Sequence, residues 1–118
     1  MNRFILIFIV LVYSSSINKS DKLQIINTSL RITVLDDLGN LIEGASVNIY
    51  INESDYREEV NPVIEEKLTD AKGRTTFKKL QFIKYFILVR KGDLNNFGGG
   101  VEVKLDAKKR NKVNIIIE

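Results

Sequence analysis

Residues 30–50 read LRITVLDDLGNLIEGASVNIY, and their side chains follow the period of a β-sheet that is buried on one face. Apolar and polar residues alternate over 30–35, and the Asp, Gly and Asn of residues 36–40 are typical of a turn. The same alternation returns over 45–51. Because successive side chains of a strand point to opposite faces, this stretch predicts a strand, a turn and a second strand.

The rest of the chain repeats this pattern in short segments. Further strands are predicted at residues 63–68, 74–77, 84–90, 101–105 and 112–118. The polar, acidic residues 52–62 predict a loop, and residues 91–100, which end in three glycines, predict another. No segment carries apolar residues at helical spacing over two turns. The sequence therefore predicts an all-β fold, a seven-stranded antiparallel β-sandwich whose last two strands pair as a hairpin.

One predicted strand, residues 84–90 (KYFILVR), is apolar on both faces, which is typical of a central strand. The residues expected in the core are Val47, Ile49, Phe77, Tyr85, Ile87, Val89 and Ile115. Phe86 and Leu88 then lie on the opposite face, where exposed apolar patches usually mark contacts. Residues 23–26, a second copy or a partner protein are the expected covers. With Asn95, Asn96 and Phe97 of the following loop, Phe86 and Leu88 form the candidate interaction surface.

The first 16 residues have the layout of a secretory signal peptide. Arg3 precedes an unbroken apolar run at residues 4–13, and three serines follow. A membrane-spanning helix needs about 20 apolar residues, so the run is too short for a stable span. We predict a signal peptide at 1–16, a lead-in segment at 17–29 that adds an edge strand or covers the core, and a sandwich domain at 30–118. The mature protein is expected to be exported: periplasmic, on the outer surface or secreted.

The composition argues against catalysis. The chain has no His and no Cys, so the commonest general base, the thiol nucleophile and the usual zinc ligands are missing. We expect a non-catalytic protein without a cofactor. A net charge of +3 spread over both signs is too weak to indicate nucleic-acid binding. The enzyme alternative is a hydrolase that uses a carboxylate pair such as Asp36 and Asp70, although a compact sandwich rarely forms the cleft it needs.

Three segments share a pattern of turn glycines and strand residues: LRITVLDDLGNLIEGASVNIY, TDAKGRTTFKKL and KYFILVRKG. The positions that carry the pattern are Asp37, Gly39, Gly44, Ala45, Val47, Thr69, Asp70, Gly73, Phe77, Leu80, Tyr85, Ile87 and Val89. On these residues the chain resembles the carboxypeptidase regulatory-like domains, which have a transthyretin-like β-sandwich. Phe82, Ile83 and Lys84 stand where the family usually carries Pro-Gly, so that turn must differ. The resemblance implies an accessory, structural or protein-interaction module, and the Ile-, Lys- and Asn-rich composition suggests a bacterial cell envelope.

Strand alternation places the loops at 36–40, 69–73 and 91–100 at one end of the sandwich. Weak candidates for Ca²⁺ ligands in these loops are Asp36, Asp37, Asp70 and Asp93. Turn capping is the simpler interpretation, because Asp carboxylates commonly accept hydrogen bonds from the backbone of their own turn. The same loops are the alternative binding site, for a carbohydrate or a peptide.

The opposite end is predicted to bring charges of both signs together. The acidic residues are Glu53, Asp55, Glu58, Glu59, Glu65 and Glu66, and the basic residues are Lys104, Lys108, Lys109, Arg110 and Lys112. Salt-screened pairing on the surface is one interpretation, and head-to-tail self-association is the other.

Overall fold

The computed structural model describes residues 27–99 and 101–118. The predicted signal peptide at 1–16 and residues 17–26 of the lead-in segment lie outside the described residues. The last lead-in residues form no additional edge strand, because residues 27 and 28 are not in a strand and Ser29 opens the first strand of the core. Within the described ranges, no helix is long and apolar enough to cross a membrane.

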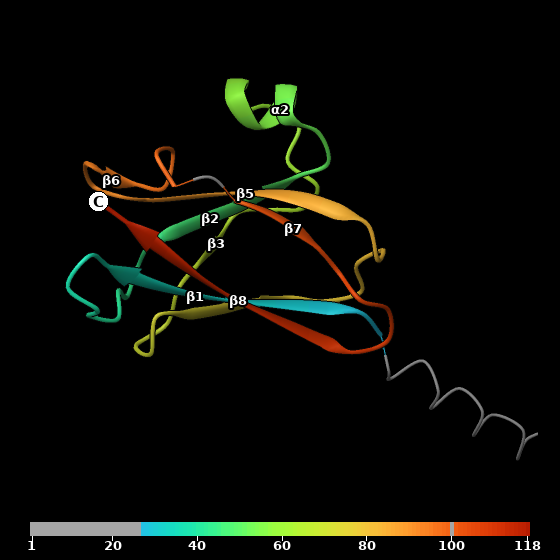
Figure 1. Ribbon diagram of the computed structural model, residues 1–118, viewed down its shortest axis with the longest axis horizontal. Helices are drawn as coiled ribbons and strands as arrows, with labels where there is room; N and C mark the ends of the chain where they lie inside the picture. The colour runs from blue at the N-terminus through green and yellow to red at the C-terminus, as the bar shows by residue number, and fades with distance from the viewer. Residues whose placement is uncertain (1–26, 100) are drawn as a thin grey trace, which may run out of the picture.

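Two β-sheets face each other and form a sandwich (Figure 1). In the smaller sheet, β1 (Ser29–Asp36) lies between β4 (Arg74–Phe77) and β8 (Arg110–Ile117). The larger sheet has the order β3 (Lys67–Leu68), β2 (Ser46–Tyr50), β5 (Lys84–Lys91) and β6 (Leu94–Asn95), and β7 (Glu102–Lys104) also pairs with β5. The short helix α2 (Glu53–Glu58) lies on the outer side of the larger sheet (Figure 1).

The core lies between the sheets and follows the predicted alternation. All seven residues expected there are buried: Val47, Ile49, Phe77, Tyr85, Ile87, Val89 and Ile115. Leu30, Ile32 and Val34 of β1 complete the opposite wall of the core. Burying an aliphatic side chain of this size stabilises the fold by roughly 1.5–3 kcal/mol, so these strands supply the main driving force for folding.

The predicted hairpin between the last two strands is wrong. β7 pairs with β5, whereas β8 crosses to the smaller sheet and runs parallel to β1 along the whole of Ser29–Asp36. The prediction of seven antiparallel strands therefore fails at this pair, and the described residues form eight strands. Strand alternation determines which face a residue occupies, but it does not determine which strand lies alongside.

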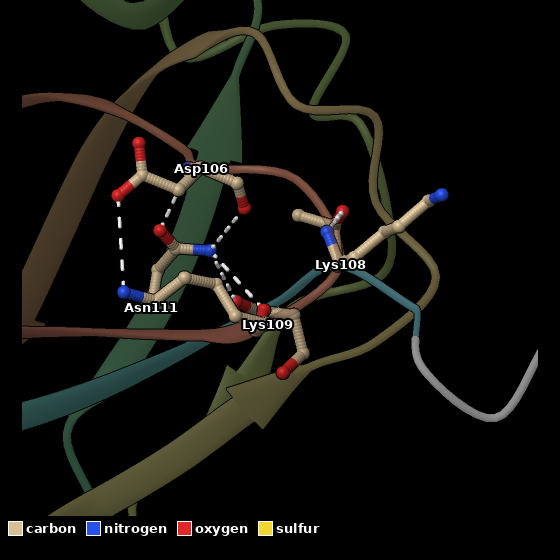
Figure 2. A network of polar contacts seen from close by, with 6 residues as sticks. Asp106, Lys108, Lys109 and Asn111 are labelled. Atoms are coloured by element: carbon tan, nitrogen blue, oxygen red, sulfur yellow. Dashed lines mark hydrogen bonds and ion pairs between the residues drawn. The ribbon is translucent and has the colours of Figure 1, made fainter.

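Side-chain hydrogen bonds in the turn between β7 and β8 support this parallel pairing (Figure 2). The Asn111 side chain accepts the backbone N–H of Asp106 (2.8 Å) and donates to the carbonyl of Ser29 (3.0 Å). The hydroxyl oxygen of Thr28 accepts the backbone N–H of Lys108 (2.9 Å). Because Thr28 and Ser29 lead into β1, these bonds fix the start of β1 against the start of β8.

Three further elements differ from the sequence prediction. The predicted loop at 52–62 contains α2, and the predicted loop at 91–100 contains β6. The strand predicted at 63–68 is reduced to β3, and Leu68, which was expected inside, is 60% exposed on the outer face of the sheet. Ile64 packs against the core as predicted.

Candidate interaction surface

A second, smaller apolar cluster lies on the outer face of the larger sheet. Tyr50 of β2 and both Phe86 and Leu88 of β5 point away from the core, because they alternate with core residues. Tyr56 of α2 lies over them, with its ring centroid 6.1 Å from that of Tyr50 and 6.0 Å from that of Phe86. Tyr50 and Leu88 are buried and Phe86 is half-buried. Strand β5 is therefore covered on both faces.

Helix α2 owes its position to local capping and to Tyr56. The Asn52 side-chain oxygen accepts the backbone N–H of Asp55 (2.8 Å), and Glu53 adds negative charge to the first turn. Glu59 ends the helix in the left-handed region at φ 57°. An isolated helix of six residues is not stable in water, so packing of Tyr56 on the sheet must hold α2 in place. Burial raises the pKa of the Tyr56 phenol above its ordinary value of 10.0.

The cover over Phe86 and Leu88 therefore comes from this chain, through a segment that was predicted to be a loop. Residues 23–26, one of the expected covers, lie outside the described residues. Leu88 is only 2% exposed and cannot belong to an exposed interaction surface, which corrects the sequence prediction. The available signal was Asn52, a strong helix N-cap residue, followed four residues later by a single aromatic side chain, Tyr56.

Asn96 was also expected at the surface and is instead buried, at 2% exposure. Its side-chain oxygen accepts the backbone N–H of Val89 (2.9 Å), and its amide donates to the carbonyl of Ile87 (2.8 Å). β6 pairs with Arg90 and Lys91 at the end of β5, and β7 pairs with residues 84–86 at its beginning. The two Asn96 bonds fill the gap between these paired segments. The Asn96 side chain thus takes the place of a strand along this edge and keeps buried backbone groups paired.

Phe86 and Phe97 of the predicted surface remain partly accessible. Together with Lys84 and Arg90, which the sequence prediction did not include, they form a surface that we call the Phe97 platform. The Phe97 ring is 41% exposed and lies 5.6 Å from the Tyr56 ring, centroid to centroid. The guanidinium carbon of Arg90 lies 5.2 Å from the Phe97 centroid, and Arg90 also pairs with Glu59 of the α2 cap. The Asn95 side chain accepts the Phe97 backbone N–H (3.0 Å), so the ring is held from several sides while much of it faces solvent.

The two best-defined aspartates at the loop end cap their own turns. The Asp36 carboxylate accepts the backbone N–H groups of Leu38 (3.0 Å) and Asn40 (2.8 Å). The Asp70 carboxylate accepts those of Lys72 (2.8 Å) and Arg74 (3.0 Å). These hydrogen bonds hold the pKa of both carboxyls below the ordinary value of 3.8. The capping interpretation is confirmed for both residues.

The candidate Ca²⁺ ligands at the loop end are not assembled into a metal site among the described residues. Asp37 and Asp93 are exposed, and no group of three or more acidic side chains in the described ranges comes close enough to hold a metal ion. A glycosidase-type general acid needs a raised pKa, whereas the pKa values of Asp36 and Asp70 are lowered. The loops at 36–40 and 69–73 are neighbours, since the backbone N–H of Val34 donates to the carbonyl of Gly73 (2.7 Å).

Comparison with known proteins supports the fold and gives no family. No protein-family model matches the chain, and no curated protein matches its sequence. Among solved structures, catechol 1,2-dioxygenase from Acinetobacter radioresistens matches 77% of this chain and 51% of its own length, at 13% identity and a TM-score of 0.56. The group B streptococcus pilus 2b backbone protein matches 76% and 41%, at 15% identity and a TM-score of 0.53. BcpA, the major pilin subunit of Bacillus cereus, matches 78% and 30%, at 14% identity and a TM-score of 0.53.

The chain spans about half of the length of the dioxygenase and less of the two pilus proteins. At these identities the likeness extends to the fold alone. The protein is therefore an all-β, two-sheet sandwich, as its sequence predicted.

The role of Tyr56 as the cover of β5 gives a stability prediction. Tyr56→Ala should lower the free energy of unfolding by about 2–4 kcal/mol, because it uncovers Tyr50, Phe86 and Leu88 and leaves α2 without an anchor. Urea unfolding measures this loss, and binding of a hydrophobic dye should rise. The control is Arg57→Ala, the exposed neighbour on α2, which should cost less than about 0.5 kcal/mol. A loss below about 1 kcal/mol for Tyr56→Ala would mean that α2 does not cover the sheet.

The capping role of Asp70 predicts how stability depends on pH. Because its folded pKa lies below the unfolded value of 3.8, the carboxylate stabilises the fold above that value, and the contribution disappears as pH falls through the folded pKa. Asp70→Asn keeps an oxygen that can accept the N–H groups of Lys72 and Arg74 but removes the charge. The variant should therefore be less stable than the original protein at neutral pH and equally stable at about pH 2. Thermal unfolding across this range measures the difference, and parallel curves would contradict the capping role.

Proposed function

We propose that this protein is an exported, non-catalytic binding module of the cell envelope that engages another protein through the Phe97 platform. Its organisation is the one predicted from the sequence, with a signal peptide at 1–16, a lead-in segment at 17–29 and a sandwich domain at 30–118. The sandwich is of the transthyretin-like type found in carboxypeptidase regulatory-like domains. Neither a cofactor nor a resident metal takes part in this function.

The exposure of Phe97 is the observation that carries the proposal. A ring that is 41% exposed, and that is already packed against Tyr56 and Arg90, loses little conformational freedom when a partner covers it. Aromatic residues and arginine are enriched among the residues that contribute most to protein interfaces. Lys84 and Glu59 supply charges at the rim of the platform, which suits a polar border around an apolar centre.

Two further observations support a non-catalytic role at the envelope. The chain lacks His and Cys, and the carboxylates of Asp36 and Asp70 are engaged in their own turns. Two of the solved structures with this fold are the group B streptococcus pilus backbone protein and the Bacillus cereus pilin subunit BcpA, and pili lie outside the cell. This agrees with the signal-peptide pattern at 1–16.

Binding of a carbohydrate or a peptide is the second candidate, because Phe97 belongs to the loop at 91–100 that such a ligand would use. Sugar rings stack on exposed aromatic side chains. The Arg90 guanidinium, however, already lies over the Phe97 ring, which favours a protein partner that can pair with both groups.

Retention of the purified protein on envelopes isolated from its host tests the proposal. Phe97→Ser should reduce retention by about tenfold or more, because loss of a central aromatic anchor typically costs about 2 kcal/mol or more of binding energy, and about 1.4 kcal/mol already corresponds to tenfold. Leu38→Ser is the matched control, since Leu38 is an 82% exposed apolar residue in the turn at 36–40 and should leave retention unchanged. Both variants should remain folded, with Phe97→Ser unfolding at a slightly lower temperature because it loses the contacts with Tyr56 and Arg90.

Three outcomes would contradict the proposal. Equal retention of the original protein and of Phe97→Ser would exclude the platform as the binding surface. Retention that survives protease digestion of the envelopes would assign the ligand to a carbohydrate. Recovery of the protein from the host cytoplasm with Met1 still present would exclude export.

A further inference from the structure

The charged side chains on the outer face of the smaller sheet are all basic. Leu30, Ile32 and Val34 of β1 point into the core, so the residues between them, and their partners on β4 and β8, point outward. The charged residues at these outward positions are Arg31, Arg74, Arg110 and Lys112, and none is acidic. We call this surface the basic face.

The charges of the basic face are not balanced within the described part of the chain. Arg31 lies directly opposite Lys112 in the β1–β8 register, and like charges in this position destabilise a sheet. The ion pairs among residues 27–99 and 101–118 involve other basic side chains, so no carboxylate lies within 4.0 Å of these two residues, of Arg74 or of Arg110. An acidic partner would remove this repulsion.

A groove of about 600 Å³ continues the basic face past the edge of β4. Arg31 and Arg74 line it together with Lys67 and Lys72. Asp70 is the acidic residue in its lining, and its carboxylate already accepts backbone N–H groups of its own turn. The basic face and the groove together carry six basic residues against Asp70, a net charge of +5.

The opposite side of the same molecule carries the complementary charge. Residues 52–66, which include α2, contain six acidic residues and one basic residue, a net charge of −5. Figure 1 places α2 outside the larger sheet, with the smaller sheet on the far side of the sandwich. Glu66 adjoins Lys67 of the groove along the chain, but α2 and the charges of β1 and β8 lie on opposite sheets. Packed sheets lie about 10 Å apart, which is about the screening length at 0.1 M salt, so the attraction between α2 and the basic face within one molecule is weak.

We propose that the basic face docks the acidic 52–66 segment of a second copy of this chain. The match of charge, +5 against −5, selects this occupant. Since the two surfaces lie on opposite sides of each molecule, the contact is head-to-tail, and repeated contacts give an open chain of copies instead of a closed dimer. The contact depends mainly on charge, so it should be weak and sensitive to salt. The contact uses the charges of residues 52–66 and not the Phe97 ring. Glu59 belongs to this segment and also borders the Phe97 platform, so the test below changes Glu58 and Glu65 and leaves Glu59 in place.

Sedimentation of protein purified after expression of the full chain tests this docking. At about 50 mM NaCl the average mass should rise with protein concentration, and at about 500 mM NaCl the protein should be monomeric. Arg74→Glu with Lys112→Glu should abolish association at low salt, as should Glu58→Lys with Glu65→Lys. All four residues are exposed, so both double variants should fold normally. An equal mixture of the two variants should form a heterodimer and nothing larger, because each variant keeps one working surface.

The control for net charge is Lys91→Glu with Lys104→Glu, which reverses two exposed lysines on the larger sheet and should leave association unchanged. Dissociation of this control, or failure of the two variants to form a heterodimer, would overturn the proposal. An original protein that stays monomeric at low salt would overturn it as well. If that monomer bound polyglutamate, the basic face would instead belong to an acidic polymer. If the protein failed to self-associate but still bound envelopes, the docking proposal would be wrong and the Phe97 platform would be unaffected. If it self-associated but did not bind envelopes, the Phe97 platform would be wrong and the docking proposal would be unaffected.

Discussion

Strand β5 must exclude water from both of its faces and from both of its edges, and the rest of the molecule is arranged around this requirement. Tyr85, Ile87 and Val89 face the core, while Leu88 faces Tyr56 of α2. Strand β2 closes one edge of β5, and β6, Asn96 and β7 close the other in turn. An ordinary sandwich strand is covered on one face only.

This double burial explains two features that would be costly elsewhere. A six-residue helix is retained because its single buried aromatic residue, Tyr56, covers an apolar surface that would otherwise meet water. A polar side chain, Asn96, is buried because the strand that should pair with the middle of β5 is interrupted there. The same arrangement leaves Phe97 at the rim, where it packs against Tyr56 but stays accessible.

The sequence predicted the faces of the strands better than their partners. Alternation placed residues such as Val47 and Ile87 in the core correctly, because the side-chain period of a strand is local information. The parallel pairing of β8 with β1 depends on contacts between the two ends of the domain, among them the bond from Asn111 to the Ser29 carbonyl, and no local pattern encodes it. Helix α2 was missed because one aromatic residue gives no helical period. For the candidate surface, the sequence correctly identified Phe97 and Phe86 as accessible. It wrongly included Leu88, because the helix that buries Leu88 was not predicted.

Native-state hydrogen exchange of the β5 amides tests most directly whether the molecule is organised around this strand. The N–H of Val89 bonds to the Asn96 side chain and that of Ile87 to the carbonyl of Val101 (3.0 Å), and both residues are fully buried. Both amides should exchange only through global unfolding, with an opening free energy equal to that measured by denaturant, whereas the amides of α2 should open at lower free energy. If the Val89 and Ile87 amides instead exchanged through local opening, as readily as the amides of α2, β5 would not be the strand on which the fold depends.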